Sequence, residues 1–234
     1  MLKAKNGKYY IEYEGKNVRI YDETIIKLNL LTNKDVAKEK IIKVNEYYDY
    51  LNKALNYLGA LRSKKDVAIY LNKKGASSKD IASIIKYLEG LNLLNDEVYA
   101  KAFINDQKNI KGDGPYKIKY KLLNKGVDEA IIDRLLSSYE DNEERDKINN
   151  LIKKYQKANR NKSSYLLKKS IELKLFNKGF SKELISEALN NFTYDDSLIK
   201  ELEEAKIRRK LKASDNSNID EEVRQKLYQK GFKV

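Results

Sequence analysis

The sequence contains no cysteine, no histidine and no tryptophan, and it has one proline among 234 residues. Without cysteine no disulfide can form, and without both residue types the chain cannot build a Ser-His-Asp triad, a cysteine nucleophile or an ordinary zinc site. The single proline, Pro115, is typical of a nearly all-helical chain. Carboxylate pairs such as Asp195-Asp196, or Asp141 with Glu143 and Glu144, remain possible catalytic groups, but they fall at predicted turns and helix starts, where they favour the helix dipole. We expect a non-enzymatic protein with no catalytic residue and no bound cofactor or metal.

Long apolar segments are missing too. No run approaches the roughly 18 apolar residues that a membrane-spanning helix requires, and the basic, polar N-terminus lacks the apolar core of a signal peptide. We expect a soluble cytoplasmic protein with no membrane partner, and we expect it to be a monomer.

Glycine is scarce, with ten in the chain, and four of the ten follow a lysine at nearly regular intervals. These pairs, 51, 53 and 52 residues apart, are Lys74-Gly75, Lys125-Gly126, Lys178-Gly179 and Lys230-Gly231. Regular spacing of this kind indicates one structural unit used repeatedly. Repeat arrays present extended surfaces, so the period favours a binding function over an enzyme.

The residues around each pair predict a helix that ends at the lysine. A leucine stands four residues before each glycine and a valine or isoleucine eight before it, which places both on one helix face. A glycine past the helix end can adopt the left-handed conformation that lets the following residue pack on that leucine. In the first three units Ser77, Asp128 or Ser181 can then cap the next helix. We predict that the pairs' glycines are structural helix caps, namely Gly75, Gly126, Gly179 and Gly231.

A further periodic helix precedes each pair. In the second unit it runs from Asp96, a candidate cap, to about Ile110, and in the third from about Glu143 to Asn159. Each unit therefore consists of three helices. The predicted repeats span residues 45–93, 96–140 and 143–192, and an incomplete repeat of two helices spans 195–234.

Residues 1–44 follow another pattern. Lys8 to Glu14 alternates and is rich in β-formers, Gly15 to Asn17 supplies a turn, and Val18 to Tyr21 can return as a second strand. Helical segments follow from Glu23 to Leu31 and from Lys34 onward. The predicted fold is mainly α: an elongated tandem array of three-helix repeats with a small N-terminal β-hairpin.

Positive charge is the strongest functional signal. The net charge is +13. The segment from Arg145 to Lys182 holds twelve basic residues, and its only acidic residues are Asp146 and Glu172. On the predicted helix the face opposite the apolar stripe carries Lys147, Lys153, Lys154, Lys157 and Arg160. Such a face suits phosphate backbones. The alternative, that these lysines are solvated by-products of a lysine-rich composition, stays open.

A second lysine pattern follows the glycines. Lysine recurs five residues and one residue before the glycine as Lys121 with Lys125, Lys174 with Lys178, and Lys226 with Lys230. These lysines can contact an acidic partner, or they can simply favour the negative end of the helix dipole. The first two pairs, with Lys168 and Lys169, complete the candidate contact residues.

One glycine cluster, Gly112-Asp-Gly-Pro115, could be mistaken for a phosphate loop. It lacks the length and the strand-loop-helix setting of such a loop. We predict a turn with Pro115 at the first position of the next helix.

Three segments together resemble the RecX family. The run Asp96-Glu-Val-Tyr-Ala-Lys-Ala-Phe-Ile104, followed by Gly112-Asp-Gly-Pro-Tyr-Lys-Ile118 and Leu122-Leu-Asn-Lys-Gly126, is similar to the family's central signature. Residues 54–75 and 171–189 resemble its first and third repeats.

The resemblance implies three-helix modules that bind the RecA recombinase in the groove of its filament on single-stranded DNA. Such a protein would restrain strand exchange, ATP hydrolysis and co-protease activity, and so tune recombination, DNA repair and the SOS response. Because the family has no short contact motif, the candidate residues rest on charge alone. Two alternatives stay open: a stand-alone helix-turn-helix-like protein that binds duplex DNA, and a scaffold for another acidic protein.

Overall fold

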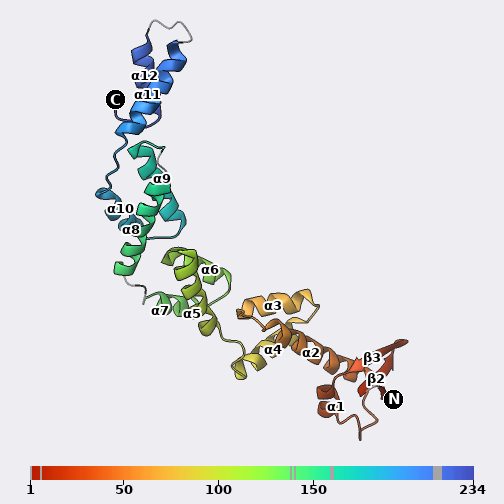
Figure 1. The fold of residues 1–234 in the computed structure, drawn as a ribbon. Coiled ribbons are helices and arrows are strands. Elements are labelled where there is room, and N and C mark those ends of the chain that lie inside the picture. Colours follow the sequence, from red (N-terminus) through yellow and green to blue (C-terminus); the bar gives the residue numbers. More distant parts are fainter. Residues whose placement is uncertain (1, 6, 138, 140, 159–160, 213–217) are drawn as a thin grey trace. The chain divides into compact units, whose positions relative to one another are not determined.

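The structure is a computed structural model that describes residues 2–5, 7–137, 139, 141–158, 161–212 and 218–234 (Figure 1). The chain divides into two compact units, Met1–Ala100 with Lys125–Asp128, and Lys101–Asn124 with Glu129–Val234. The described residues form twelve α-helices, one π-helical turn and three short strands. The prediction of a mainly α fold with a small N-terminal β-structure is confirmed.

The N-terminal strands form an antiparallel sheet in the order β1-β2-β3 (Figure 1). The predicted hairpin corresponds to β2 (Lys8–Tyr13) and β3 (Lys16–Ile20), whereas the third strand, β1 (Lys3–Lys5), was not predicted. The first helix, α1 (Asp22–Leu28), stops before the predicted Leu31 because Asn29 adopts a left-handed conformation with φ 51°.

One face of this sheet packs on α1 and on the first turns of α2 (Lys38–Tyr57). Ile11, Ile20, Ile25 and Ile41 are buried in the core between them. The Asn45 side chain of α2 accepts a hydrogen bond from the Tyr21 N–H (2.8 Å) and donates one to the Arg19 carbonyl (2.9 Å). Because these are backbone groups at the end of β3, the long helix is fixed to the sheet.

The remaining helices follow in groups along the chain, and we propose that these groups are the repeats expected from the sequence. The first helices of repeats 1 and 3 begin at Lys38 and Asp141, before the predicted starts at residues 45 and 143. Repeat 1 contains α2, α3 (Lys64–Lys73) and α4 (Ser78–Gly90). Repeat 2 contains α5 (Asp96–Asp106), the π-helical turn η1 (Gln107–Lys111), α6 (Pro115–Asn124) and α7 (Glu129–Leu136). Repeat 3 contains α8 (Asp141–Ala158), α9 (Ser164–Asn177) and α10 (Lys182–Asn190), and repeat 4 contains α11 (Ser197–Lys212) and α12 (Ile219–Gln229).

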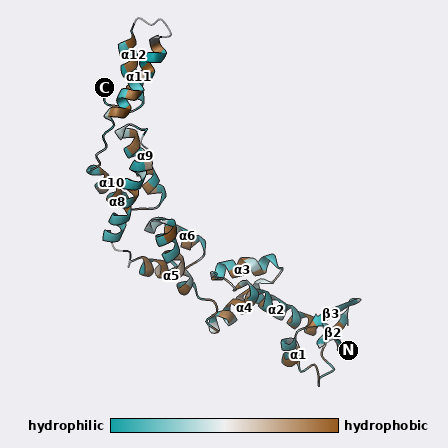
Figure 2. Ribbon diagram, viewed as in Figure 1, coloured by the Kyte–Doolittle hydropathy of each residue, from teal (hydrophilic) through white to brown (hydrophobic). Residues whose placement is uncertain are grey.

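Repeats 1, 3 and 4 each have a separate core built around the residues that flank the Lys-Gly pair. In repeat 1 Leu71 and Ala76 pack with Ile84 and Leu88, and in repeat 3 Leu175 and Phe180 belong to the corresponding cluster. In repeat 4 the core contains Leu227 and Phe232. Figure 2 shows hydrophobic and hydrophilic residues on the helices of every repeat, as expected for small units whose helices have an apolar face toward the core and a polar face toward solvent.

The predicted cap of α5 is wrong. The Asn95 side chain, not that of Asp96, accepts hydrogen bonds from the N–H groups of Glu97 (2.9 Å) and Val98 (3.2 Å). The Asp96 carboxylate instead accepts the Lys64 N–H at the start of α3 (2.8 Å). Burial raises the pKa of Asp96, against the opposing effect of this hydrogen bond. In repeat 3 the Asp196 carboxylate does the same for the Ser164 N–H at the start of α9.

Candidate interaction surface

The Lys-Gly pairs end four helices with a left-handed glycine. The φ angles of Gly75, Gly126, Gly179 and Gly231 are 91°, 76°, 78° and 76°. In repeats 1, 3 and 4 the N–H after the glycine donates to the carbonyl of the leucine four residues before it, at 3.1, 3.4 and 3.1 Å. These bonds close Schellman turns, in which the residue after the glycine is buried against the leucine. The glycines therefore serve the backbone rather than a ligand.

Three of the four turns also meet the start of the second helix of the preceding repeat, and we call each such contact a joint. In the joint between repeats 2 and 3 the Gly114 N–H donates to the Lys178 carbonyl (2.7 Å) and the Tyr116 N–H to the Gly179 carbonyl (3.1 Å). A Cβ atom added to Gly179 would lie 2.3 Å from the Lys117 nitrogen. The absence of a side chain at Gly179 thus permits the two backbones to touch.

The other two joints are built from side chains. A Cβ atom at Gly126 would lie 3.0 Å from the Lys65 side chain, and one at Gly231 would lie 2.8 Å from the Ser163 hydroxyl. That hydroxyl donates to the Lys230 carbonyl (2.8 Å). Gly75 has no such neighbour among the described residues, since the nearest atom to an added Cβ is the Tyr50 hydroxyl oxygen at 3.5 Å.

The glycine cluster at 112–115 belongs to the joint of repeats 2 and 3. Asp113 is buried, and Lys121 and Lys117 place their ammonium groups 2.7 and 3.3 Å from its carboxylate. Although burial pushes the pKa of Asp113 up, the hydrogen bonds from Lys121 and Lys117 outweigh it and hold the pKa below its ordinary value. Pro115 begins α6. The segment is a structural turn, as the missing phosphate-loop features indicate.

Several candidate contact lysines are already engaged inside the protein. Lys121 binds the Gln107 side-chain oxygen (2.6 Å) in addition to Asp113, and Lys125 lies 3.0 Å from the Asp66 carboxylate. Lys178 donates to the carbonyls of residues 111 and 112 at 2.9 and 3.1 Å. Their charges are partly neutralised, so these three lysines stabilise joints and loops.

Lys147 is engaged as well. Its ammonium group lies 3.3 Å from the Glu143 carboxylate and 3.3 Å from the Tyr139 hydroxyl, and it donates to the Lys108 carbonyl (3.2 Å). Burial lowers the pKa of Lys147 despite the nearby Glu143. Lys169 and Lys174 instead lie against aromatic rings, 4.6 Å from the centre of Tyr165 and 4.9 Å from that of Tyr155. Both are exposed, so their ammonium groups still reach solvent.

Four candidates remain unneutralised, and we call Lys153, Lys154, Lys157 and Lys168 the free lysines. The first three are exposed near the end of α8, and Lys168 is half-buried in α9. Within the described part of the chain, none of their side chains makes an ion pair or hydrogen bond. Arg160, the remaining candidate, lies outside the described residues.

A second exposed feature was missed by the sequence reasoning. Six large side chains on the outward sides of α6 and α9 are between 39% and 67% exposed, and we call them the outer line. They are Tyr116, Tyr120, Leu123, Tyr165, Leu173 and Phe176.

The outer line keeps the same register in both helices. Leu123 and Phe176 stand three residues before the glycine of their repeat, and Tyr120 and Leu173 stand six before it. The buried leucines stand four before it, so the two sets occupy opposite sides of each helix. The sequence signal was present, because both helices carry apolar residues outside the buried pattern. Clustered exposed apolar side chains are a feature of protein-binding surfaces, so the outer line is a candidate contact surface.

The fold and its joints define a helical repeat protein made of three-helix units. Residues 95–136 match the family model described as RecX, second three-helix domain. The regulatory protein RecX of Bacillus licheniformis is 31% identical over 224 residues, which cover 91% of this chain and 84% of that protein. The regulatory protein RecX of Enterococcus faecalis is 28% identical and covers 99% of this chain and 91% of its own length.

Solved structures agree with this assignment. A crystal structure of regulatory protein RecX has a TM-score of 0.70 at 22% identity, over 82% of this chain and 98% of that one, which supports the fold. The crystal structure of RecX from Lactobacillus salivarius has a TM-score of 0.58 at 30% identity, over 63% of this chain and 96% of that one. The chain belongs to the RecX family, whose similar members are named regulatory proteins.

The described residues were also compared with the requirements of a metal site and of a membrane span. The described residues contain no group of three or more aspartates or glutamates placed to hold a metal ion. Among the described helices, none has the length and hydrophobicity needed to cross a bilayer.

Proposed function

We propose that this chain is a non-enzymatic regulator of the RecA recombinase. It binds the RecA filament on single-stranded DNA and restrains strand exchange, ATP hydrolysis and co-protease activity, thereby tuning recombination, DNA repair and the SOS response. Membership of the RecX family supports the choice of RecA as partner, and the exposed features of repeats 2 and 3 support a binding mechanism.

The observation that carries the mechanism is the difference between free and engaged lysines. Lys121, Lys125, Lys147 and Lys178 are held by internal partners, whereas the free lysines are not. An engaged ammonium group must first lose its partner before it can bind a phosphate or carboxylate, which costs part of the energy gained. The free lysines need no such exchange, so they are the polyanion contacts of the proposed complex.

The outer line supports a protein contact in addition. Tyrosine and phenylalanine are enriched where protein interfaces gain most of their binding energy. The lysines beside the outer line on α6 already form ion pairs. Lys119 pairs with Glu129 and Asp133, and Lys121 pairs with Asp113. This surface therefore suits the apolar part of a protein partner better than a phosphate backbone. We assign the outer line to RecA and the free lysines to DNA backbone or acidic filament surface.

A titration of this protein into RecA hydrolysing ATP on single-stranded DNA tests the proposal. We expect ATP hydrolysis to fall as the protein is added, and to fall less at about 200 mM than at about 50 mM salt, because salt competes for the anions that the lysines bind. Unchanged hydrolysis at both salt concentrations would contradict the proposal. Tight duplex binding without any effect on RecA would instead favour a stand-alone DNA-binding protein.

A further inference from the structure

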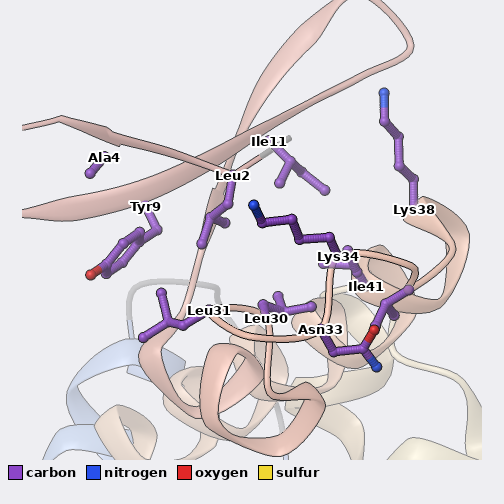
Figure 3. A pocket seen from close by; sticks show the side chains of 11 residues that line it. Leu2, Ala4, Tyr9, Ile11, Leu30, Leu31, Asn33, Lys34, Lys38 and Ile41 are labelled. Carbon is purple, nitrogen blue, oxygen red and sulfur yellow. The ribbon is translucent and has the colours of Figure 1, made fainter.

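The N-terminal sheet leaves a pocket that the proposed function does not use. It has a volume of about 520 Å³ and lies between one face of the sheet and the segment that joins α1 to α2 (Figure 3). That volume falls in the range of roughly 300–1,000 Å³ typical of ligand sites. Ile11, Leu30 and Ile41 in its lining are buried, whereas Leu31 at its rim is 63% exposed.

The pocket exists because β1 is too short to cover the apolar residues of the segment that joins α1 to α2. Ala4 pairs with Tyr9, and Ile11 pairs with Val18, so their side chains lie on the face that packs on the helices. That face is continued by Leu2 before β1. β2 has six residues but β1 has three, and β1 forms the edge of the sheet with no further strand beside it among the described residues. The apolar segment under this edge is therefore incompletely covered.

The charged residues that line the pocket are both lysines. In Figure 3 the Lys34 side chain extends from the loop toward Leu2 and Ile11, and Lys38 rises from the start of α2. None of the described lining residues is acidic, and neither lysine makes an ion pair or side-chain hydrogen bond with a described residue. An apolar floor under two unneutralised ammonium groups selects a ligand with apolar side chains and carboxylates.

We propose that this edge binds an extended acidic peptide segment of a partner protein as a fourth strand. Its backbone hydrogen-bonds to the free edge of β1, its apolar side chains enter the pocket, and carboxylates on the same face of that strand meet Lys34 and Lys38. A second copy of this chain fits poorly, since pairing two β1 edges would bring Lys3 and Lys5 of one copy against those of the other.

Binding of a labelled probe peptide to the full chain tests the site. The probe is acetyl-Thr-Val-Thr-Asp-Thr-Ile-Thr-Asp-amide carrying fluorescein, in which the apolar and acidic side chains share one face of the extended strand, and its affinity is measured by anisotropy. We expect saturable binding of this probe, no binding of the same peptide with lysine in place of aspartate, and slower amide exchange in β1 when the probe is bound. A version N-methylated on alternate amides should bind at least about tenfold more weakly, a ratio that corresponds to ~1.4 kcal/mol.

Matched charge variants separate the pocket from general basicity. Lys34→Glu with Lys38→Glu should weaken probe binding about tenfold, or ~1.4 kcal/mol. Lys40→Glu with Lys43→Glu changes the net charge equally at nearby exposed positions in α2 outside the pocket, and should leave binding nearly unchanged. Equal effects of both pairs, absence of saturable binding, or equal binding of the N-methylated probe would overturn the proposal. Self-association through β1, detected as a molar mass of the protein that rises with its concentration, would also overturn it. The test contains no RecA, so its outcome is independent of the proposed function.

Discussion

The four glycines of the Lys-Gly pairs share a conformation but differ in what surrounds them. All four have positive φ, which an L side chain rarely adopts. Gly179 also touches the backbone of the preceding repeat, whereas a Cβ atom added to Gly75 would make only an ordinary contact with the Tyr50 hydroxyl, at 3.5 Å. The same substitution should therefore cost different amounts at the two sites.

Gly75→Ala should lower the free energy of unfolding by about 1 kcal/mol, the cost of a left-handed alanine. Gly179→Ala should lower it by about 2–4 kcal/mol, because overpacking against the Lys117 backbone adds to the same penalty. Urea unfolding followed by circular dichroism measures both. Amide exchange of Gly114 and Tyr116 should accelerate only in Gly179→Ala, since these amides donate to residues 178 and 179. Equal costs and unchanged exchange would show that the joint does not depend on this glycine.

The glycine turns could be predicted from the sequence, but which lysines have internal partners could not. The turns are local, because glycine, leucine and the following residue lie within six positions of one another. The partner of Lys125 is Asp66, 59 residues away, so no charge count along the chain could separate engaged from free lysines. The role of Asp96 was predicted wrongly for the same reason, because the Lys64 N–H that its carboxylate accepts is 32 residues away.

At the scale of elements, the second helices of repeats 2 and 3 do two tasks. Ile118 and Leu122 in α6, and Ile171 and Leu175 in α9, fill the cores, while the outer line faces solvent. The helices themselves could be predicted from periodicity. The short β1 could not, because Lys-Ala-Lys carries no strand signal and pairs only because β2 offers an edge. The outer line could have been predicted, because both helices carry apolar residues outside the buried pattern.

The outer line should matter for binding and little for folding. Tyr120→Ser with Phe176→Ser should weaken binding to the RecA filament by at least about tenfold if these are hot-spot residues, while unfolding shifts by no more than about 0.5 kcal/mol per site because both side chains are exposed. Tyr87→Ser, a half-exposed tyrosine on α4 outside the outer line, is the matched control. Filament binding can be followed by co-sedimentation. Wild-type binding by the double variant would remove the outer line from the interface.

At the scale of the whole molecule, the repeats differ in charge and in exposed side chains despite a shared plan. The free lysines lie in repeat 3, and the outer line covers repeats 2 and 3. The N-terminal sheet carries a separate pocket. The shared plan could be predicted from the glycine period. The different roles proposed for the repeats could not be predicted, since they depend on which side chains the fold leaves without partners.

In the proposed mechanism the free lysines carry the electrostatic part of filament binding. The most direct measurement is the affinity for the RecA filament on single-stranded DNA as a function of salt, for three proteins. These are the wild type, the variant with Lys153→Glu, Lys154→Glu and Lys157→Glu, and a control with Lys73→Glu, Lys79→Glu and Lys86→Glu. The control lysines are exposed in repeat 1 and carry the same charge change.

We predict a clearly negative slope of log affinity against log salt for the wild type and the control. The repeat 3 variant should bind more weakly, with a slope shallower by about 2 if each lost lysine contacts one phosphate, at ~0.7 per contact for single strands. Circular dichroism should show all three proteins equally folded. A repeat 3 variant with the wild-type affinity and slope would contradict the claim and leave the free lysines as a solvated face.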